Sequence, residues 1–343
     1  FNAFIRRVLI IVKEDNKNLK LMIKEFFNKS VKKYYESLSE LAKEIDINQI
    51  TQEDADRKFI LLTDNFLSKG ERFEKNVGSN IYMKKIKEAF REIVGCWVYK
   101  SPIVKMAYDK PRGYPGDYKL FEIIYNNKPM LTADGIGLCS EKYFLNSGYT
   151  KAVRTRKNKM KNILQDFIEN TNLSSVRLFN VACGPSREIR ELLYDPIFSS
   201  RREIIFTGLD NDEKALEFSR MHLENLPDNI KLRFLHENVL NIFRDDKYYD
   251  TIGKQDIIYI LGLTEYLPDR IFKRLMRFLS EILDVGGMLV ITYKDKNVTF
   301  PSLPPDWFCG WAFIKRSKED LINAATELGA DKFHLKIEKE GTE

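Results

Sequence analysis

The pattern of apolar and polar positions changes near the middle of the chain. Before residue 100, apolar residues recur every three or four positions, which is the spacing of one face of an α-helix. The clearest such stretch covers residues 19–41, and further helices are expected over 52–67 and 77–99. After Thr171, short apolar runs alternate with helix-like segments. The chain therefore divides into a mostly helical part and a part that alternates strands and helices.

Five short apolar runs in the second half have the length and composition of buried strands. They are Val176–Val181, Ile204–Leu209, Lys231–Leu235, Asp256–Leu261 and Met288–Tyr293. Helices are expected between them over 187–194, 212–225 and 269–283, and the glycines of segment 283–287 suit the end of the last helix. Near-continuous apolar strands joined by helices indicate a parallel sheet covered on both faces. The sequence predicts a doubly wound α/β fold over residues 151–343.

Composition narrows the class of protein. The chain has 343 residues, 43% of them hydrophobic, which suffices for two domains. The net charge of +6 comes from 56 basic and 50 acidic side chains, a balance that argues against a dedicated nucleic-acid binder. No apolar run has the length of a membrane span. The four cysteines form no CxxC pair and have no ligand spacing with the histidines, so we expect neither zinc nor disulfides, and a cytoplasmic location.

A loop rich in proline and glycine lies within the expected helical domain, residues 1–150. It spans 108–118 and includes the sequence KPRGYPGDY at Lys110–Tyr118. Proline and glycine together specify a structured turn. Its polar and aromatic residues are Arg112, Tyr114, Asp117 and Tyr118. A lid or pocket wall and an ordinary surface loop are equally weighted interpretations, and the helical domain could also form a homodimer.

The amphipathic stretch 151–170 is strongly basic in its first half. A solvated helix face is the usual meaning of such a run. Alternatively, Arg154 or Arg156 points into a site and pairs with a carboxylate, for which the guanidinium has matching geometry.

Polar residues follow the first three predicted strands. The turn Ala182–Ser186 comes after the first strand and precedes a helix, so backbone N–H groups and the positive helix end lie together there. Asp210 and Asn211 follow the second strand, and Glu237, Asn238 and Val239 follow the third. The carboxyl ends of parallel strands meet at one edge, where a carboxylate can accept both hydroxyls of a ribose. These residues predict a nucleoside cofactor at that edge.

The glycine content of the first turn bears on which cofactor it holds. A nicotinamide enzyme has the fingerprint GxGxxG, whereas this turn contains only Gly184. A Walker loop is also absent from the sequence. S-adenosylmethionine (SAM) is the cofactor that this pattern favours. A turn and a helix-capping acid without any ligand is the weaker alternative, because three strand ends agree.

At these residues the chain resembles the class I SAM-dependent methyltransferases, from Val176 to Glu343. Their first motif has an acid followed by alternating glycines, and the corresponding positions here are Asn180, Ala182, Gly184 and Ser186. The resemblance implies a Rossmann-like sheet and a SAM site. The cofactor-binding residues that it implies are Ala182, Cys183, Gly184, Pro185, Asp210, Asn211, Glu237, Asn238, Val239, Gly262 and Leu263. The last two would lie beneath the sulfonium.

Four segments resemble one bacterial group of this superfamily more closely. They are 110–118, 182–188, 262–268 and 307–316. The group includes enzymes implicated in making methyl esters of 3-hydroxy fatty acids, which serve as quorum signals. The resemblance implies carboxyl O-methylation of a small, partly apolar acid. Glu265 occupies a position where the group has an aspartate.

Candidate chemistry follows from the fourth strand end and from the proline-rich loop. The candidate catalytic residues are Glu265, Tyr266, Asp117 and Tyr118, and the candidate substrate-binding residues are Arg112, Tyr114, Arg156, Tyr293 and Trp311. The aromatic residues Trp307, Phe308, Trp311 and Phe313 either pack a core or wall an acyl pocket.

Three other functions stay open at this point. An N- or O-methyltransferase of a polar metabolite or protein side chain would use Asp117 or Glu265 as a base. A SAM-binding sensor without turnover is the second. A nucleic-acid methyltransferase fits least, because Leu261–Thr264 replaces the Asn-Pro-Pro-aromatic motif. The chain starts at Phe1 and shows no last antiparallel strand after Phe333–Glu338, so we expect a piece of a longer protein.

Overall fold

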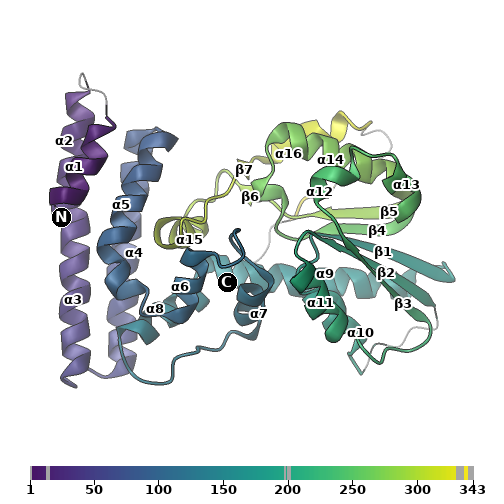
Figure 1. Ribbon diagram of the computed structural model, residues 1–343, viewed down its shortest axis with the longest axis horizontal. Helices are drawn as coiled ribbons and strands as arrows, with labels where there is room; N and C mark the ends of the chain where they lie inside the picture. Colours follow the sequence, from purple (N-terminus) through teal and green to yellow (C-terminus); the bar gives the residue numbers. More distant parts are fainter. Residues whose placement is uncertain (1, 13–15, 197, 199–201, 330–335, 339–343) are drawn as a thin grey trace. The chain divides into compact units, whose positions relative to one another are not determined.

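The computed structural model describes residues 2–12, 16–196, 198, 202–329 and 336–338. These residues form two compact units (Figure 1). Within the described residues, the first unit comprises 2–151 and 299–312, and the second comprises 152–298 with 313 onward. The predicted second domain included 299–312, whereas the structure groups this segment with the helices of the first unit.

The first unit is helical, as its sequence pattern predicts. Its helices are α1 (Asn2–Ile10), α2 (Lys17–Glu25), α3 (Lys32–Asp46), α4 (Gln52–Val77), α5 (Asn80–Val98), α6 (Pro102–Asp109), α7 (Tyr118–Asn126), α8 (Ile136–Leu145) and α15 (Leu303–Cys309), which follows the short turn η3 (Phe300–Ser302). A π-helical segment, η1 (Phe26–Val31), joins α2 to α3. The predicted helix over 19–41 is therefore a single succession of helical turns.

Aromatic side chains explain why residues 299–312 belong to the first unit. The Trp307 ring is fully buried and packs edge-to-face on Phe66 and Phe90, with ring centroids 5.4 and 5.1 Å apart. Trp311 packs in the same way on Tyr149. Large rings buried in such pairs contribute strongly to a core. Of the two interpretations of this aromatic cluster, core packing is the one seen for Trp307 and Trp311.

The second unit is built on a parallel sheet of five strands. They are β1 (Ser175–Val181), β2 (Glu203–Asp210), β3 (Ile230–His236), β4 (Gln255–Ile260) and β5 (Leu283–Ile291), in the order β3-β2-β1-β4-β5. Its helices are α9 (Gly148–Asn170, which starts in the first unit), α10 (Arg187–Leu193), α11 (Glu213–Met221), α12 (Val239–Ile242), α13 (Lys247–Ile252), α14 (Asp269–Ile282) and α16 (Lys318–Thr326). Three remaining short elements are η2 (Thr264–Tyr266), β6 (Lys294–Asp295) and β7 (Lys315–Arg316).

Helices cover both faces of this sheet (Figure 1). Helices α9, α10 and α11 lie on one face, and α12, α13, α14 and α16 lie on the other. The strand order reverses direction between β1 and β4. The doubly wound α/β fold is thus confirmed, and its ligand crevice is expected at the carboxyl ends of β1 and β4.

One predicted boundary is wrong. Residues 283–287 were expected to end the last helix, but α14 ends at Ile282 and β5 already begins at Leu283. Leu283 pairs with Gln255, and the register shifts before Ile257 pairs with Met288. Gly287 belongs to this irregularity, since a Cβ there would lie 2.9 Å from the Asp256 carbonyl oxygen. Glycine in a strand permits such a close backbone approach. In the expected final segment, residues 333–335 lie outside the described residues.

Candidate functional site

The turn after β1 has an unusual backbone. Ala182, Gly184 and Ser186 have φ angles of +58°, +52° and +48°. Residues other than glycine seldom adopt this left-handed conformation, so two of the three positions are strained. The turn is held by Cys183 N–H, which donates to the Leu209 carbonyl at 2.9 Å. A Cβ added at Gly184 would meet no heavy atom within 4 Å, so there is open space beside it.

Asp210, at the end of β2, connects this turn to the next strand. Its Oδ2 accepts from the Gly184 N–H at 2.8 Å, and its Oδ1 accepts from the Asp212 N–H at 2.9 Å. Burial raises the pKa of this carboxyl group, and the backbone N–H donors oppose that shift. Each carboxylate oxygen has a second lone pair, so Asp210 can still accept hydrogen bonds from a ligand.

The segment after β3, Glu237–Val239, is hydrogen-bonded to the end of β2 in turn. The Glu237 N–H donates to the Asp210 carbonyl at 3.0 Å. The Glu237 carboxylate accepts from the Asn238 N–H at 2.7 Å, from the Asn241 side chain and from the Tyr248 hydroxyl, and the last of these contacts lowers the pKa of Glu237 most. Asn238 Oδ1 caps α12 through the Leu240 N–H. The structure therefore brings together Gly184, Asp210 and Glu237, with Asn238 next in the chain.

Several other predicted cofactor residues have side chains that are buried or packed against the core. The Cys183 thiol is buried, and this burial raises its pKa well above the usual range. Pro185 is also buried. The Asn211 carbonyl contacts His236 Nε2 at 3.2 Å. Val239 and Leu263 pack against the core on the α14 face of the sheet.

Gly262 follows β4 and meets a guanidinium. Its φ is +88°, and its N–H donates to Thr292 Oγ1 at 3.0 Å. A Cβ at this position would lie 2.6 Å from Nη2 of Arg156, which reaches it from α9. Of the two interpretations of the basic stretch, Arg156 is thus buried beside a strand end rather than solvated.

This contact predicts the effect of Gly262→Ala. We expect loss of activity together with a loss of about 1–2 kcal/mol of stability, because alanine is strained at positive φ and its methyl group displaces Arg156. Gly253→Ala is the matched control, since Gly253 has φ +71° but a Cβ there has open space. Urea unfolding and turnover measure both effects. Equal activity in the two variants would contradict a role for this contact.

Glu265 is a second neighbour of Arg156. The two side chains form an ion pair with 3.6 Å between Nη1 and Oε1, and they are 3% and 1% exposed. Among the described residues, Glu265 Oε2 has no hydrogen-bond partner. Buried carboxylate oxygens are normally hydrogen-bonded. Glu265 Oε2 is therefore an acceptor suited to a ligand or substrate N–H or O–H.

A second buried acid, Glu188, was not predicted from the sequence. Its Oε1 accepts from Asn180 Nδ2 and from the Tyr259 hydroxyl, both at 2.9 Å. Burial raises the pKa of Glu188. Asn180 Oδ1 is buried and has no hydrogen-bond partner in the part of the chain that the structure describes. The only sequence signal for Glu188 was its position, the second residue of the helix that follows the turn.

The remaining candidates fall in both units. In the second unit, Tyr266 packs on Phe313 and Tyr293 packs against the core on the α14 face. In the first unit, the Asp117 carboxylate caps α7 through the N–H groups of Lys119 and Leu120. Nearby side chains of the loop are Arg112, which lies over the Tyr118 ring, and Tyr114, while a Cβ at Gly116 would meet Trp311. The catalytic and substrate-binding roles of these residues stay predictions.

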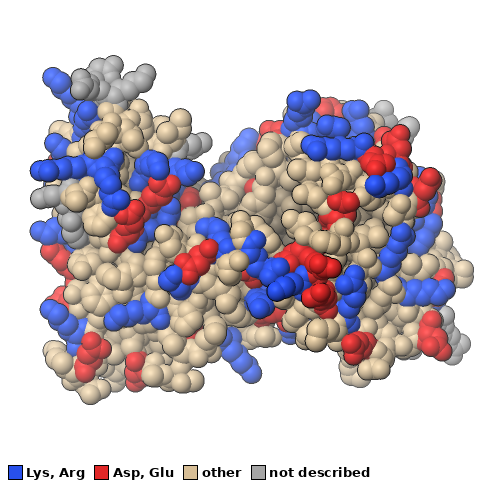
Figure 2. Space-filling view, viewed as in Figure 1, with Lys and Arg blue, Asp and Glu red and all other residues tan. Residues whose placement is uncertain are grey.

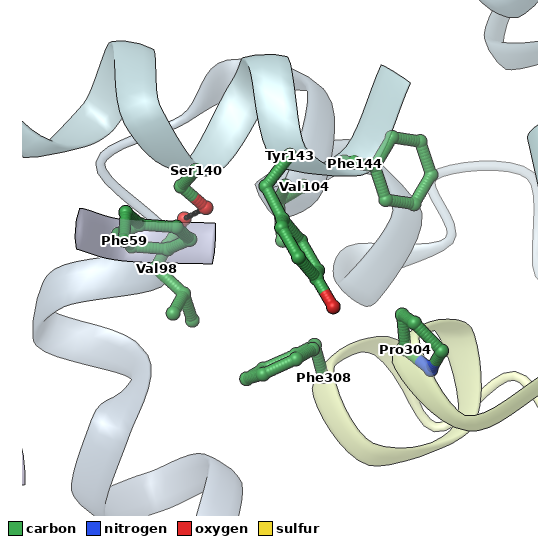
Figure 3. Close-up of a pocket in the computed structure, with 8 residues that line it drawn as sticks. All are labelled: Phe59, Val98, Val104, Ser140, Tyr143, Phe144, Pro304 and Phe308. Atoms are coloured by element: carbon green, nitrogen blue, oxygen red, sulfur yellow. Dashed lines mark hydrogen bonds between the residues drawn. The ribbon is translucent and has the colours of Figure 1, made fainter. Parts of the chain in front are cut away.

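A cavity in the first unit does not serve as a substrate pocket. Figure 3 shows its lining, which includes Phe59, Tyr143 and Phe308. Its volume of about 10 Å³ is close to the minimum that one water molecule needs. It is too small for an acyl chain.

Surface and metal chemistry add little to the site. Basic and acidic side chains are interspersed over the face drawn in Figure 2. Among the described residues, no helix has the length and apolar character required to cross a membrane. Within the same residues, no three His, Cys, Asp or Glu side chains are grouped as a metal site would need.

Comparison with known proteins gives matches only among solved structures. No family model matches the chain, and no curated protein does. A possible exported protein from Bordetella parapertussis shares 14% identity, with TM-score 0.47 over 86% of this chain and 89% of that one. Magnesium protoporphyrin IX methyltransferase from Synechocystis PCC 6803 with bound SAM shares 14% identity, with TM-score 0.38 over 53% of this chain and 72% of that one. Mitomycin 7-O-methyltransferase shares 14% identity, with TM-score 0.37 over 70% of this chain and 57% of that one. Such distant likeness concerns the fold alone.

Proposed function

We propose that this protein is a SAM-dependent methyltransferase whose cofactor binds at the carboxyl ends of β1 to β4. The observation that carries the proposal is the hydrogen-bonded connection of three strand ends. Asp210 accepts from Gly184 through its carboxylate and from Glu237 through its carbonyl. The residues that the sequence predicts for one nucleoside therefore belong to one continuous group.

The residues present suit this cofactor. Space opens beside Gly184, and Asp210 offers carboxylate lone pairs to ribose hydroxyls. Asn180 Oδ1 and Glu265 Oε2 are buried acceptors on both sides of the switch between β1 and β4. When bound, SAM supplies a methyl group on a positively charged sulfur. The protein then mainly aligns the accepting atom, and proximity of this kind accounts for a large part of a rate enhancement.

For the substrate, we propose a small, partly apolar acid, with carboxyl O-methylation of a hydroxy fatty acid favoured. The resemblance of segments 182–188 and 262–268 supports this class. Arg156 supports it too, because a buried guanidinium beside Gly262 suits a carboxylate. The aromatic cluster gives no support, since Trp307 and Trp311 are fully buried among the aromatic rings of the first unit.

One observation favours N- or O-methylation as a second candidate. Glu265 Oε2 is a buried acceptor with no hydrogen-bond partner among the described residues, and an amine or hydroxyl nucleophile needs such a proton acceptor. A carboxylate nucleophile needs none. A SAM sensor without turnover, a cytoplasmic location and a homodimer stay predictions.

Calorimetry and labelled SAM test the proposal. We expect saturable SAM binding by the full chain and transfer of label to one compound class in lipid or metabolite extracts. Absence of SAM binding would overturn the proposal, and tight binding without any demethylated product would favour the sensor. Glu265→Gln separates the acceptors, because kcat should fall about 100-fold or more with an amine or hydroxyl and less than about tenfold with a carboxylate. Glu213→Gln, in the first turn of α11, is the control.

A further inference from the structure

We propose that Arg316 is a positioning residue for the substrate side of the site. It holds the segment Thr264–Asp269, which carries Glu265 and Tyr266 past the end of β4. The inference rests on the proposed function, and its full effect on turnover is expected where an amine or hydroxyl is the acceptor.

The Arg316 guanidinium makes contacts along the whole segment. Its Nη1 donates to the Thr264 carbonyl at 2.7 Å, and its Nη2 donates to the Leu267 carbonyl at 2.6 Å. Its Nε and Nη2 also donate to Asp269 Oδ1, at 3.2 and 2.9 Å. The group lies 4.3 Å from the centre of the Phe272 ring, and the side chain is only 3% exposed. Arg316 is thus an internal brace and not a surface charge.

The braced segment needs such partners because it is irregular. It forms a single 3-10 turn, η2, and Pro268 then precedes α14. The Thr264 carbonyl accepts the Leu267 N–H of this turn at 3.3 Å, and Arg316 adds a second donor to it and a donor to the Leu267 carbonyl. Buried carbonyls are normally hydrogen-bonded. A planar guanidinium can donate to two carbonyls and a carboxylate at once, whereas a lysine ammonium is a single point charge.

Further hydrogen bonds hold the backbone around Glu265. The Ile314 N–H, two residues before Arg316, donates to the Glu265 carbonyl at 2.8 Å. The Thr292 hydroxyl accepts from the Gly262 N–H, and the Thr292 carbonyl accepts from the Thr264 hydroxyl. The backbone on both sides of Glu265 is therefore held by hydrogen bonds, and the Glu265 side chain forms its ion pair with Arg156.

The cofactor side is held by a different set of bonds. Gly184, Asp210 and Glu237 are connected to one another through β1, β2 and β3. The Arg316 contacts described above all lie between Thr264 and Phe272. Loss of the brace should therefore affect turnover more than SAM affinity.

Arg316→Lys tests this separation. We expect kcat to fall about 100-fold, which is what a misplacement of about 1 Å can cost, while the Kd for SAM changes less than about threefold. Hydrogen exchange in the peptide 262–268 should become faster, a readout that needs no identified substrate. Asp269→Asn removes the charge of a carboxylate that is 77% exposed and keeps its accepting Oδ1, so a smaller shift in the same direction is expected.

Arg177→Lys is the matched control. Arg177 donates to Asp256 at 2.8 Å and to Asp284 at 2.6 Å, near the amino ends of β1, β4 and β5. This variant should lower the melting temperature and leave both kcat and exchange in 262–268 unchanged. Unchanged exchange and kcat in Arg316→Lys, or equal changes in both variants, would overturn the proposal. Absence of SAM binding by the unmodified chain would instead refute the methyltransferase function.

Discussion

Replacing Glu265 with glutamine is expected to lower the free energy of unfolding by about 3–5 kcal/mol. The substitution keeps the shape of the side chain but removes its charge. Arg156 is then buried beside Gly262 without its carboxylate counter-charge, and an uncompensated buried charge is strongly destabilising. Urea unfolding followed by circular dichroism measures the change.

A double variant separates stability from function in this pair. Arg156→Met/Glu265→Met should recover most of the lost stability, because apolar groups of similar volume often replace a buried ion pair without cost. We expect it to be inactive, because it lacks the Arg156 guanidinium that is proposed to meet the substrate carboxylate as well as the Glu265 acceptor. Glu25→Gln is the control, since its pair with Lys29 is exposed and should contribute at most about 1 kcal/mol. A loss below about 1 kcal/mol in Glu265→Gln would contradict the buried-pair argument.

Asp210→Asn is expected to raise the Kd for SAM about 10- to 100-fold, since hydrogen bonds to a charged group contribute about 1.5–3 kcal/mol. The variant loses the negative charge that would accept ribose hydroxyls. It also places an amide donor opposite one of the N–H groups of Gly184 and Asp212. Calorimetry measures the change, and the exposed Asp245→Asn is the control. Unchanged affinity would remove Asp210 from the cofactor site.

The pH dependence of SAM binding should show the same residue. Burial raises the pKa of Asp210, so protonation begins at a higher pH than for an ordinary aspartate. Affinity should therefore weaken on acidification from a higher pH than the usual value of about 3.9 would give, and Asp210→Asn should lack this component. In the absence of ligand, the free energy of unfolding changes with pH in the opposite direction to SAM affinity. As pH rises from the ordinary value to the raised one, the unfolded state loses its proton first and stability falls.

The residues proposed to bind the cofactor each lie directly after a strand, and their proximity to one another could be predicted for that reason. Ala182–Ser186, Asp210 and Glu237 each follow directly on an apolar strand. Parallel strands align their carboxyl ends, so residues far apart in the chain come together without further information. The bond between Gly184 and Asp210 is the direct consequence.

The contacts among the residues proposed for the substrate side were predicted only in part. Glu265 and Arg156 were named separately as candidates, but nothing in the sequence showed that they form a pair, because 109 positions separate them. Glu188 was missed, since a Glu in the first turn of a helix usually faces solvent and favours the helix dipole. Only its contacts with Asn180 and Tyr259 reveal it as a buried acid.

Short-range patterns predicted the parallel sheet, its covering helices and the alignment of its strand ends, because periodicity and strand length act over short distances along the chain. The three-dimensional contacts were needed to show that Trp307 and Trp311 fill the core of the first unit, that Leu283 begins β5, and that Arg316 donates to the Thr264 carbonyl. These outcomes depend on packing between distant segments, where burial and hydrogen-bond satisfaction choose among residues that look equivalent in the sequence.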